Sequence, residues 1–400
     1  MTRSVALDSA RAACAGLLFC LPAHADPGLA PSDEPSFLRK VSETLDVYGR
    51  FDGHLSFAAH ELGFANNGSR FGLKAEQSLG SGFALFGAGE WSIKLGEGDN
   101  RYHLEQNPDT GFGTIATTQS SAIGTRLGFV GLRLAAYGTL TLGKQWSVYY
   151  DVSQWTDRYT VFGATGSSTF NAGTDGGQMG TGRANDAVSY RAELGPFRLG
   201  VMAQFRAATP SLLDSLAGSL SYETSFGLRA GIAYSHALLE ASPVVLVGFD
   251  GNGADALTFG VSYSDERWVL ASVNTWTRNH EAVSLAEGAI VYDTLGSELF
   301  IARKFLGRVL SYAGFDLAVA RHLPTPQLAT MQLAMQGVDP NYGTRDVLFG
   351  ARWLFDAAGL SYAYVEGRTG ASIAADGAPA PTVLTLGLRL CYSLRDALGD

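Results

Sequence analysis

The chain has 400 residues, of which 46% are hydrophobic and 17% charged, with 49 glycines and a formal net charge of −9. The acidic balance argues against a nucleic-acid partner, which needs a basic surface. Beyond residue 25 no apolar run reaches the length of about 18 residues that a membrane-spanning helix requires. High glycine and low charge favour strands and turns over helices.

Residues 1–25 have the features of a secretory signal peptide. Basic residues flank an apolar stretch, and Ala-His-Ala at 23–25 offers a cleavage site with small residues. Cleavage there leaves Cys391 as the one remaining cysteine, so we expect no internal disulfide. Residues 26–46 are rich in proline and charge, and we expect them to form a disordered or periplasmic preamble.

The stretch VYGRFDGHLSF, residues 47–57, alternates strictly. Apolar or small residues occupy every second position, and Tyr48, Arg50, Asp52 and His54 lie between them. Because a strand directs alternate side chains to opposite faces, this segment has one apolar face and one charged face.

The same alternation recurs along the whole chain. The further segments lie near 69–76, 83–93, 124–133, 139–145, 185–193, 197–206, 225–235, 242–250, 255–264, 267–278, 296–304, 311–320, 345–355, 359–367 and 382–392. Turn-like connections alternate with long ones at roughly 94–122, 147–183, 207–220, 279–288, 321–344 and 368–381. The sequence therefore predicts about sixteen strands of roughly ten residues in an up-and-down meander.

Strand length indicates where the apolar face points. Ten residues rise about 33 Å, and a tilt near 45° leaves roughly 23 Å of height, close to the apolar band of an outer-membrane barrel. A closed barrel also leaves no backbone group unpaired in lipid. We therefore predict an all-β transmembrane antiparallel barrel over residues 47–392, followed by a C-terminal extension at 393–400, with the charged face toward a water-filled lumen.

Five stretches of the sequence resemble the general porins of Gram-negative outer membranes. They are VYGRFDGHLSF, GSRFGLKAEQSLGSG, TRLGFVGL, GTLTLGKQWSVYYDV and NDAVSYR, all in the first half, whereas the second half matches only in rhythm. The resemblance implies an exported homotrimer in the cell outer membrane, in contact with membrane lipid and lipopolysaccharide. It also implies a third long loop that folds into the lumen and narrows it.

The loop at 147–183 corresponds to that constriction loop. By the resemblance, Asp151 is a retained acid just after the strand, and Asp157 is one of two acids that face the pore. Val161 stands where the family has the second acid, and Arg158 stands where an uncharged residue is usual. The sequence thus departs from the cation-preferring pattern, and it predicts a pore that is nearly neutral or mildly anion-preferring.

The resemblance also places a cluster of arginines on the opposite wall: Arg70, Arg126 and Arg183. Alternation agrees, since Arg126 alternates with Leu127 and Phe129, which we then expect to face outward. Arg50 and Lys74 share the lumen parity of their strands and are expected to extend the cluster. Without the resemblance, ordinary solvated strand residues would be the preferred interpretation.

The function implied is passive diffusion of small hydrophilic solutes and ions, with no cofactor and no catalysis. One alternative is a solute-specific channel, in which Tyr150, Trp155, Tyr159 and Phe162 form a stacking track for solutes. A less favoured alternative is a barrel phospholipase or protease. Only His54 and Ser56 share a face in a way that could support a nucleophile, and no residues have metal-ligand spacing.

Lys144 shares the parity of the outward-facing Leu140 and Leu142. A charge facing lipid at the midplane costs about 2–4 kcal/mol, whereas a subunit contact with an acidic partner costs less. The second long loop carries such acids at Glu97, Asp99 and Glu105, and in the family this loop reaches a neighbouring subunit. We therefore predict that these residues meet at the trimer interface.

Overall fold

A computed structural model describes residues 44–58, 61–93, 123–169, 180–205, 213–238, 245–247, 253–285, 288–322, 339–374 and 377–395. The predicted signal peptide and nearly all of the preamble lie outside these residues, as do the last five residues of the C-terminal extension. Among the described residues, no helix is both long and apolar enough to cross a membrane.

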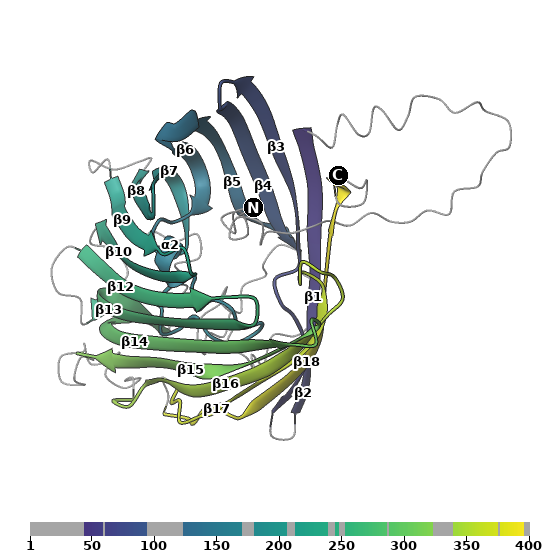
Figure 1. The fold of residues 1–400 in the computed structure, drawn as a ribbon. Coiled ribbons are helices and arrows are strands. Elements are labelled where there is room, and N and C mark those ends of the chain that lie inside the picture. The colour runs from purple at the N-terminus through teal and green to yellow at the C-terminus, as the bar shows by residue number, and fades with distance from the viewer. Residues whose placement is uncertain are drawn as a thin grey trace, which may run out of the picture.

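The strands form one sheet that curves round and closes on itself (Figure 1). In chain order they are β1 (Leu45–Ala58), β2 (Glu61–Asn66), β3 (Arg70–Gly80), β4 (Phe83–Ile93), β5 (Ile123–Leu134), β6 (Thr139–Trp146), β7 (Arg183–Leu194), β8 (Phe197–Phe205), β9 (Leu213–Glu223), β10 (Leu228–Leu238), β11 (Val245–Val247), β12 (Gly253–Ser264), β13 (Trp268–Leu285), β14 (Gly288–Phe305), β15 (Val309–Arg321), β16 (Gly343–Leu354), β17 (Tyr362–Gly370) and β18 (Val383–Ser393). The 3₁₀ helix η1 (Ala135–Tyr137) and the helix α2 (Tyr150–Ser153) complete the described elements. The ring closes where β1 pairs antiparallel with β18, from Tyr48 opposite Ser393 to Ala58 opposite Val383.

The described segments make sixteen wall strands, with β2 and β3 counted as one and β11 left out. β2 and β3 both pair with β1 and form one strand that is interrupted at residues 67–69. The short β11 pairs in parallel with β14, outside the antiparallel series. The predicted antiparallel barrel of about sixteen strands is therefore confirmed.

The total is right although two predicted segments are not. The described part of the stretch 242–250 is the short β11, and its apolar residues at 244–247 run on without alternation. The wall strand β9 occupies 213–223, most of which was expected to be loop. Its outward residues Leu216 and Leu220 are separated by a glycine, so the alternation is hard to see in the sequence. The expected loop at 279–288 is likewise mostly strand.

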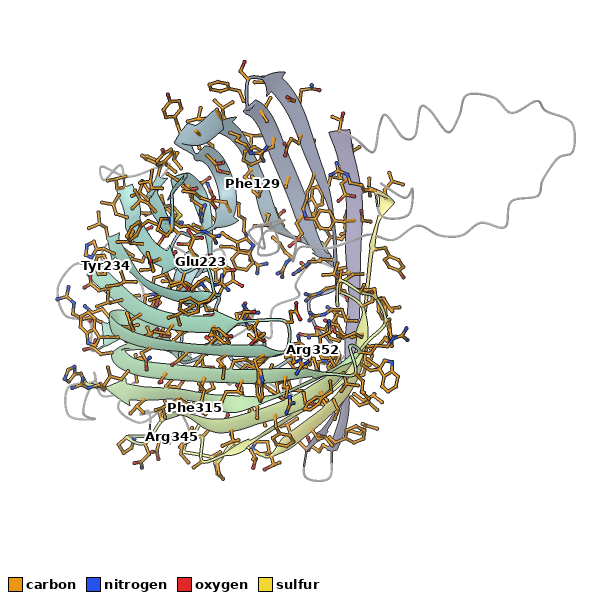
Figure 2. All side chains as sticks on the ribbon, viewed as in Figure 1. Phe129, Glu223, Tyr234, Phe315, Arg345 and Arg352 are labelled. Atoms are coloured by element: carbon orange, nitrogen blue, oxygen red, sulfur yellow. The ribbon has the colours of Figure 1, made fainter. Side chains whose placement is uncertain are left out.

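The two faces of the wall differ as predicted. In β1, Phe51 and Leu55 are exposed on the outer face at 36% and 39%, whereas Asp52 and His54 are buried on the inner face. Figure 2 shows side chains on both sides of the ribbon, with Arg352 on the inner side.

A bulge overturns the parity prediction in β5. The register between β4 and β5 shifts beside Glu90, so Arg126 is an extra residue in β5. Such an extra residue, a β-bulge, turns the side chains that follow it to the opposite face of the strand. Leu127 is buried opposite Glu90, and Phe129 pairs with Ala88 on the same inner face, so neither points outward.

Candidate functional site

The segment that follows β6 lies inside the ring of strands (Figure 1). Residues 147–169 and 180–182 of the predicted constriction loop are described, and residues 170–179 are not. The segment begins with α2, which contacts β9, β10 and β12. The described part therefore lies against the inner wall, as the sequence predicted for this loop.

Glycines in the wall make room for the loop. A Cβ atom at Gly260 of β12 would lie 2.8 Å from the ring of Trp155 and 3.0 Å from Val152. On β14, a Cβ atom at Gly296 would lie 1.9 Å from the carbonyl oxygen of Gly166. Only glycine allows the loop backbone and side chains to approach the sheet so closely.

A single carboxylate on β17 holds the tip of the loop. The backbone N–H groups of residues 160–162 all donate to Glu366, at N···O distances of 2.6, 2.8 and 2.8 Å. The hydroxyl of Tyr312 also donates to Glu366, which is completely buried. Because buried backbone N–H groups need acceptors and a carboxylate has two oxygens, Glu366 alone satisfies the three consecutive N–H groups of this turn.

Three more carboxylates form a row on the inner wall beside Glu366: Glu298, Asp316 and Asp346. Asp316 accepts the N–H groups of residues 165 and 166 at 3.3 and 2.7 Å, and Glu298 accepts the hydroxyl of Thr156. All three are at most 4% exposed. Glu298 and Asp316 thus bond to the loop, whereas Asp346 accepts the hydroxyl of Ser372 at 2.6 Å.

The predicted arginines gather on the other side of the lumen. Arg126 Nε lies 2.9 Å and Arg70 Nε 3.4 Å from the carboxylate of Glu90. Arg183 lies over the ring of Trp146, 5.4 Å from its centroid, and interacts electrostatically with the same carboxylate. The sequence analysis missed Glu90, although it has inward parity in the predicted strand 83–93.

Lys74 also lies on the inner wall. Its Nζ lies 4.6 Å from the ring centroid of Tyr48, whose hydroxyl donates to Glu90 at 3.2 Å. Lys74 therefore borders the arginine cluster, as its parity predicted.

The loop contributes charges of both signs. Asp157 accepts the hydroxyl of Tyr150, and burial raises its pKa above the usual range of an aspartate. The next residue, Arg158, donates from Nε to the carbonyl of Trp155 at 2.8 Å. Val161 is 2% exposed, so its side chain packs inward on the loop and does not border the passage.

Burial, with the nearby Arg229 and Arg352, lowers the pKa of Arg158 to about 10. Arg158 therefore keeps its charge near neutral pH.

Asp151 lies at the base of the loop. Its carboxylate lies 2.8 Å from Arg191 Nε and accepts the hydroxyl of Ser219 at 3.4 Å. Asp151 holds the base of the loop to β7 and β9.

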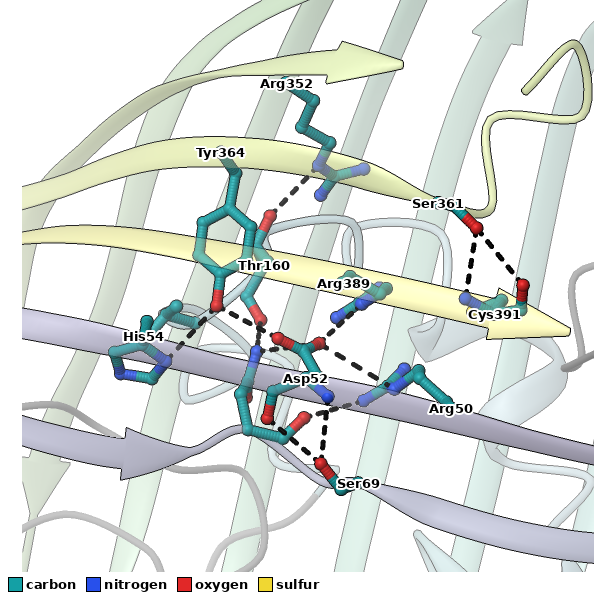
Figure 3. Close-up of polar contacts among 12 residues, drawn as sticks. Arg50, Asp52, His54, Ser69, Thr160, Arg352, Ser361, Tyr364, Arg389 and Cys391 are labelled. Carbon is teal, nitrogen blue, oxygen red and sulfur yellow. Dashed lines mark hydrogen bonds and ion pairs between the residues drawn. The ribbon is translucent and has the colours of Figure 1, made fainter. Parts of the chain in front are cut away.

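A second group of arginines, which the sequence analysis did not single out beyond Arg50, surrounds Asp52 near the seam of the barrel (Figure 3). Asp52 Oδ2 lies 2.5 Å from Arg389 Nε and 3.8 Å from Arg50 Nε, and Oδ1 accepts the hydroxyl of Tyr364 at 3.0 Å. Arg352 donates to Thr160 Oγ1 at 3.0 Å and to the carbonyl of Arg158.

Arg352 and Arg389 both lie over the ring of Tyr362, at 4.9 and 5.0 Å from its centroid. Their inward parity in predicted strands 345–355 and 382–392 was the signal available in the sequence. The porin-like motifs do not extend to these strands, so the resemblance gave no reason to select them.

The residues behind the alternative functions have structural partners. Trp155, Tyr159 and Phe162 are 4%, 7% and 3% exposed, so they pack the loop against the wall and do not form an open stacking track. His54 Nδ1 lies 3.2 Å from the hydroxyl of Tyr364.

Lys144 pairs with Gly128 of β5, and its Nζ donates to the carbonyl of Thr125 at 3.0 Å in an exposed contact. The acids expected to meet it, Glu97, Asp99 and Glu105, lie outside the described residues.

Comparison with known proteins identifies the barrel. A family model described as Gram-negative porin matches residues 10–388. The chain belongs to the Gram-negative porins. Outer membrane porin N of Escherichia coli (strain K12) is 27% identical over 312 residues, which cover 72% of this chain and 75% of that protein. Outer membrane protein F of Serratia marcescens is 30% identical over 278 residues, which cover 66% and 67%.

Among solved structures, the Salmonella typhi OmpF complex with daunomycin superposes on this porin with a TM-score of 0.68 at 19% identity, covering 88% of this chain and 98% of that one. The fold is thus that of the porins. The predicted function, an outer membrane porin for passive diffusion of small hydrophilic solutes, and the predicted outer membrane location are confirmed.

Proposed function

We propose that the diffusion pore of this porin is narrowest where the loop around Asp157 faces Arg70, Arg126 and Arg183, and that it prefers anions weakly. The supporting observation is the inventory of charged side chains around the lumen. Arginines outnumber carboxylates there: Arg50, Arg70, Arg126, Arg158, Arg183, Arg352 and Arg389 against Asp52, Glu90 and Asp157.

The remaining inner carboxylates do not offset this excess. Asp346 lies 3.6 Å from Arg368 Nε, which balances its charge. Glu298, Asp316 and Glu366 accept hydrogen bonds from the loop and are at most 1% exposed. Their charge is therefore directed into the contact between loop and wall. Charges on outer loops lie beyond a Debye length of about 8–10 Å and are largely screened. Charged rings select ions by sign, so the local excess of arginines favours anions.

Three further properties belong to the same proposal. The porin assembles as a homotrimer, it makes and breaks no covalent bond, and it contacts outer membrane lipid and lipopolysaccharide. The signal peptide at 1–25 is removed, and residues 26–46 and 393–400 flank the barrel without contributing to the pore. Family membership supports the trimer, the absence of catalysis and the membrane contacts, and the sequence features of residues 1–46 and 393–400 support the rest.

A planar-bilayer recording tests the proposal. We expect conductance steps in groups of three and a small reversal potential of the anion-selective sign in a salt gradient. A strong cation preference would contradict the proposed selectivity, and single steps of one size would contradict the trimer.

A further inference from the structure

The rim of the barrel at β13, β14 and β15 carries basic residues beside aromatic ones. Arg267 and Trp268 belong to the short turn between β12 and β13, and Arg303 and Lys304 end β14. The turns are bonded to each other, since Lys304 N donates to the carbonyl of Arg267 at 2.8 Å. Arg267, Arg303 and Lys304 line one open pocket of about 460 Å³.

This rim lies at one edge of the apolar band. Trp276 and Trp268 both point outward from β13, at 38% and 37% exposure, and are eight positions apart. That separation spans about 27 Å along a strand, or roughly 19 Å across the membrane at a 45° tilt. The two tryptophans therefore mark the two interfacial girdles, and Trp268 lies at the short-turn end, which is periplasmic in porins.

Arg303 is held at this girdle by two rings. It pairs with Trp268 across the strands, and its guanidinium lies 5.0 Å from the Trp268 ring and 4.8 Å from the Phe305 ring. Within the described part of the chain, Arg303 has no carboxylate within 4 Å. The rings fix the plane of the guanidinium and leave its N–H groups available.

The opposite girdle shows the contrast. Arg278, beyond Trp276 on the same outer face, lies 2.5 Å from the carboxylate of Asp255. An arginine on the outer wall thus has an acidic partner within the protein at one girdle and lacks one at the other, among the residues described.

The acids near Arg303 do not supply that partner. Asp265 accepts the backbone N–H groups of Arg267 and Trp268, each at 2.7 Å, and the hydroxyl of Tyr263 at 3.0 Å. Glu266 lines the pocket, but in the described structure it forms no ion pair with the three cations. The pocket therefore keeps an excess of positive charge at the level of lipid headgroups.

We propose that this pocket binds the phosphate of an anionic phospholipid, such as phosphatidylglycerol, in the periplasmic leaflet. Arg303 donates to the phosphate oxygens, and Arg267 in the adjoining turn adds a second positive charge. Ile301, exposed at 36% two residues from Arg303 on the same face, lies where the acyl chain would run. A guanidinium held in plane matches the geometry of two phosphate oxygens.

The test is native mass spectrometry of the full-length, delipidated porin titrated with dioleoyl-phosphatidylglycerol. A double variant, Arg267→Gln with Arg303→Gln, should bind the lipid roughly 30-fold more weakly, because each basic residue near an anionic headgroup contributes a factor of about five. Arg278→Gln, at the opposite girdle, should leave the affinity unchanged. Conductance and the shift between heated and unheated samples on gels verify that each variant is folded.

Several outcomes would overturn the proposal. They are an unchanged phosphatidylglycerol affinity in the double variant, an equal loss in Arg278→Gln, and equal affinity of the unmodified porin for phosphatidylethanolamine. Equally tight binding of inorganic phosphate alone would likewise show that the pocket recognises a soluble anion and not a lipid.

Discussion

The two sides of the lumen wall use ionic side chains for opposite purposes. From β3 to β7, arginines surround the carboxylate of Glu90 on the inner wall. On β15 and β17, the carboxylates of Asp316 and Glu366 accept backbone N–H groups of the loop. A carboxylate can only accept and a guanidinium can only donate, so acids suit the binding of exposed backbone N–H groups. One side thus sets the charge of the pore, and the other sets its shape.

The largest effect is expected from removing the main anchor of the loop. Glu366→Ala leaves the N–H groups of residues 160–162 without their acceptor, because all three donate to this side chain. The free energy of unfolding should fall by about 3 kcal/mol, and the loop should leave the wall. Urea titration in lipid vesicles and single-channel noise measure the two consequences.

Glu76→Ala is the matched control, because Glu76 pairs with Arg133 at 2.6 Å near the periplasmic turn and has no described contact with the loop. It should leave channel noise unchanged, since half-exposed pairs contribute about 1 kcal/mol or less. Equal noise in both variants would show that Glu366 does not hold the loop.

A smaller effect is expected on the basic side. Arg70→Gln removes one cation from the cluster around Glu90, so the ratio of anion to cation permeability should fall by about two- to fivefold. The reversal potential in a salt gradient measures this ratio. Arg133→Gln, near the periplasmic turn, should change it much less, and an equal shift would place the selective charges outside the cluster.

Asp157, on the loop between the two sides of the lumen wall, should make the ion selectivity depend on pH. Burial raises the pKa of Asp157, so on acidification it is neutralised before carboxyls with ordinary values. Losing this negative charge increases the anion preference, and we expect the increase as the pH falls from neutral, before carboxyls with ordinary pKa values are protonated. Reversal potentials recorded over that fall in pH measure it. Asp157→Asn should show the stronger anion preference throughout, and a persisting pH step in that variant would assign it to another group.

The smallest effect is expected from Lys144, on the wall strand β6. Lys144→Glu should reverse an attraction to the acids of the second long loop in a neighbouring subunit and loosen the trimer on unheated gels. Lys74→Glu is the control, because it makes the same charge change on the inner wall beside Tyr48. Trimers of equal heat stability in both variants would argue against an interface at Lys144.

Much of the fold follows from the sequence because period-two alternation directly encodes the two faces of a barrel wall. The prediction fails where a local event breaks the period. The bulge at Arg126 turns Phe129 inward, and the glycine between Leu216 and Leu220 conceals β9. Neither event has a signature that alternation alone can detect.

The site residues that lie in porin-like stretches could be predicted from the sequence. Arg70, Arg126 and Asp157 could be selected from porin-like stretches, and the first two meet at Glu90. Glu366 and Arg352 could not, since their roles depend on strands far along the chain being brought against residues 158–162. Such long-range contacts between loop and wall are set by closure of the barrel and not by local sequence.

The seam of the barrel has a consequence for how the protein folds. The ion pair between Asp52 and Arg389 joins residues 337 positions apart, and the strands β1 and β18 that carry it close the ring. Until these two strands meet, each has an open edge that can pair with other chains. Forming so distant a contact is slow because of the entropy lost on closing the connecting chain. The unclosed barrel is therefore the stage at which this porin is most exposed to aggregation, and it is the stage that most needs protection by chaperones during export.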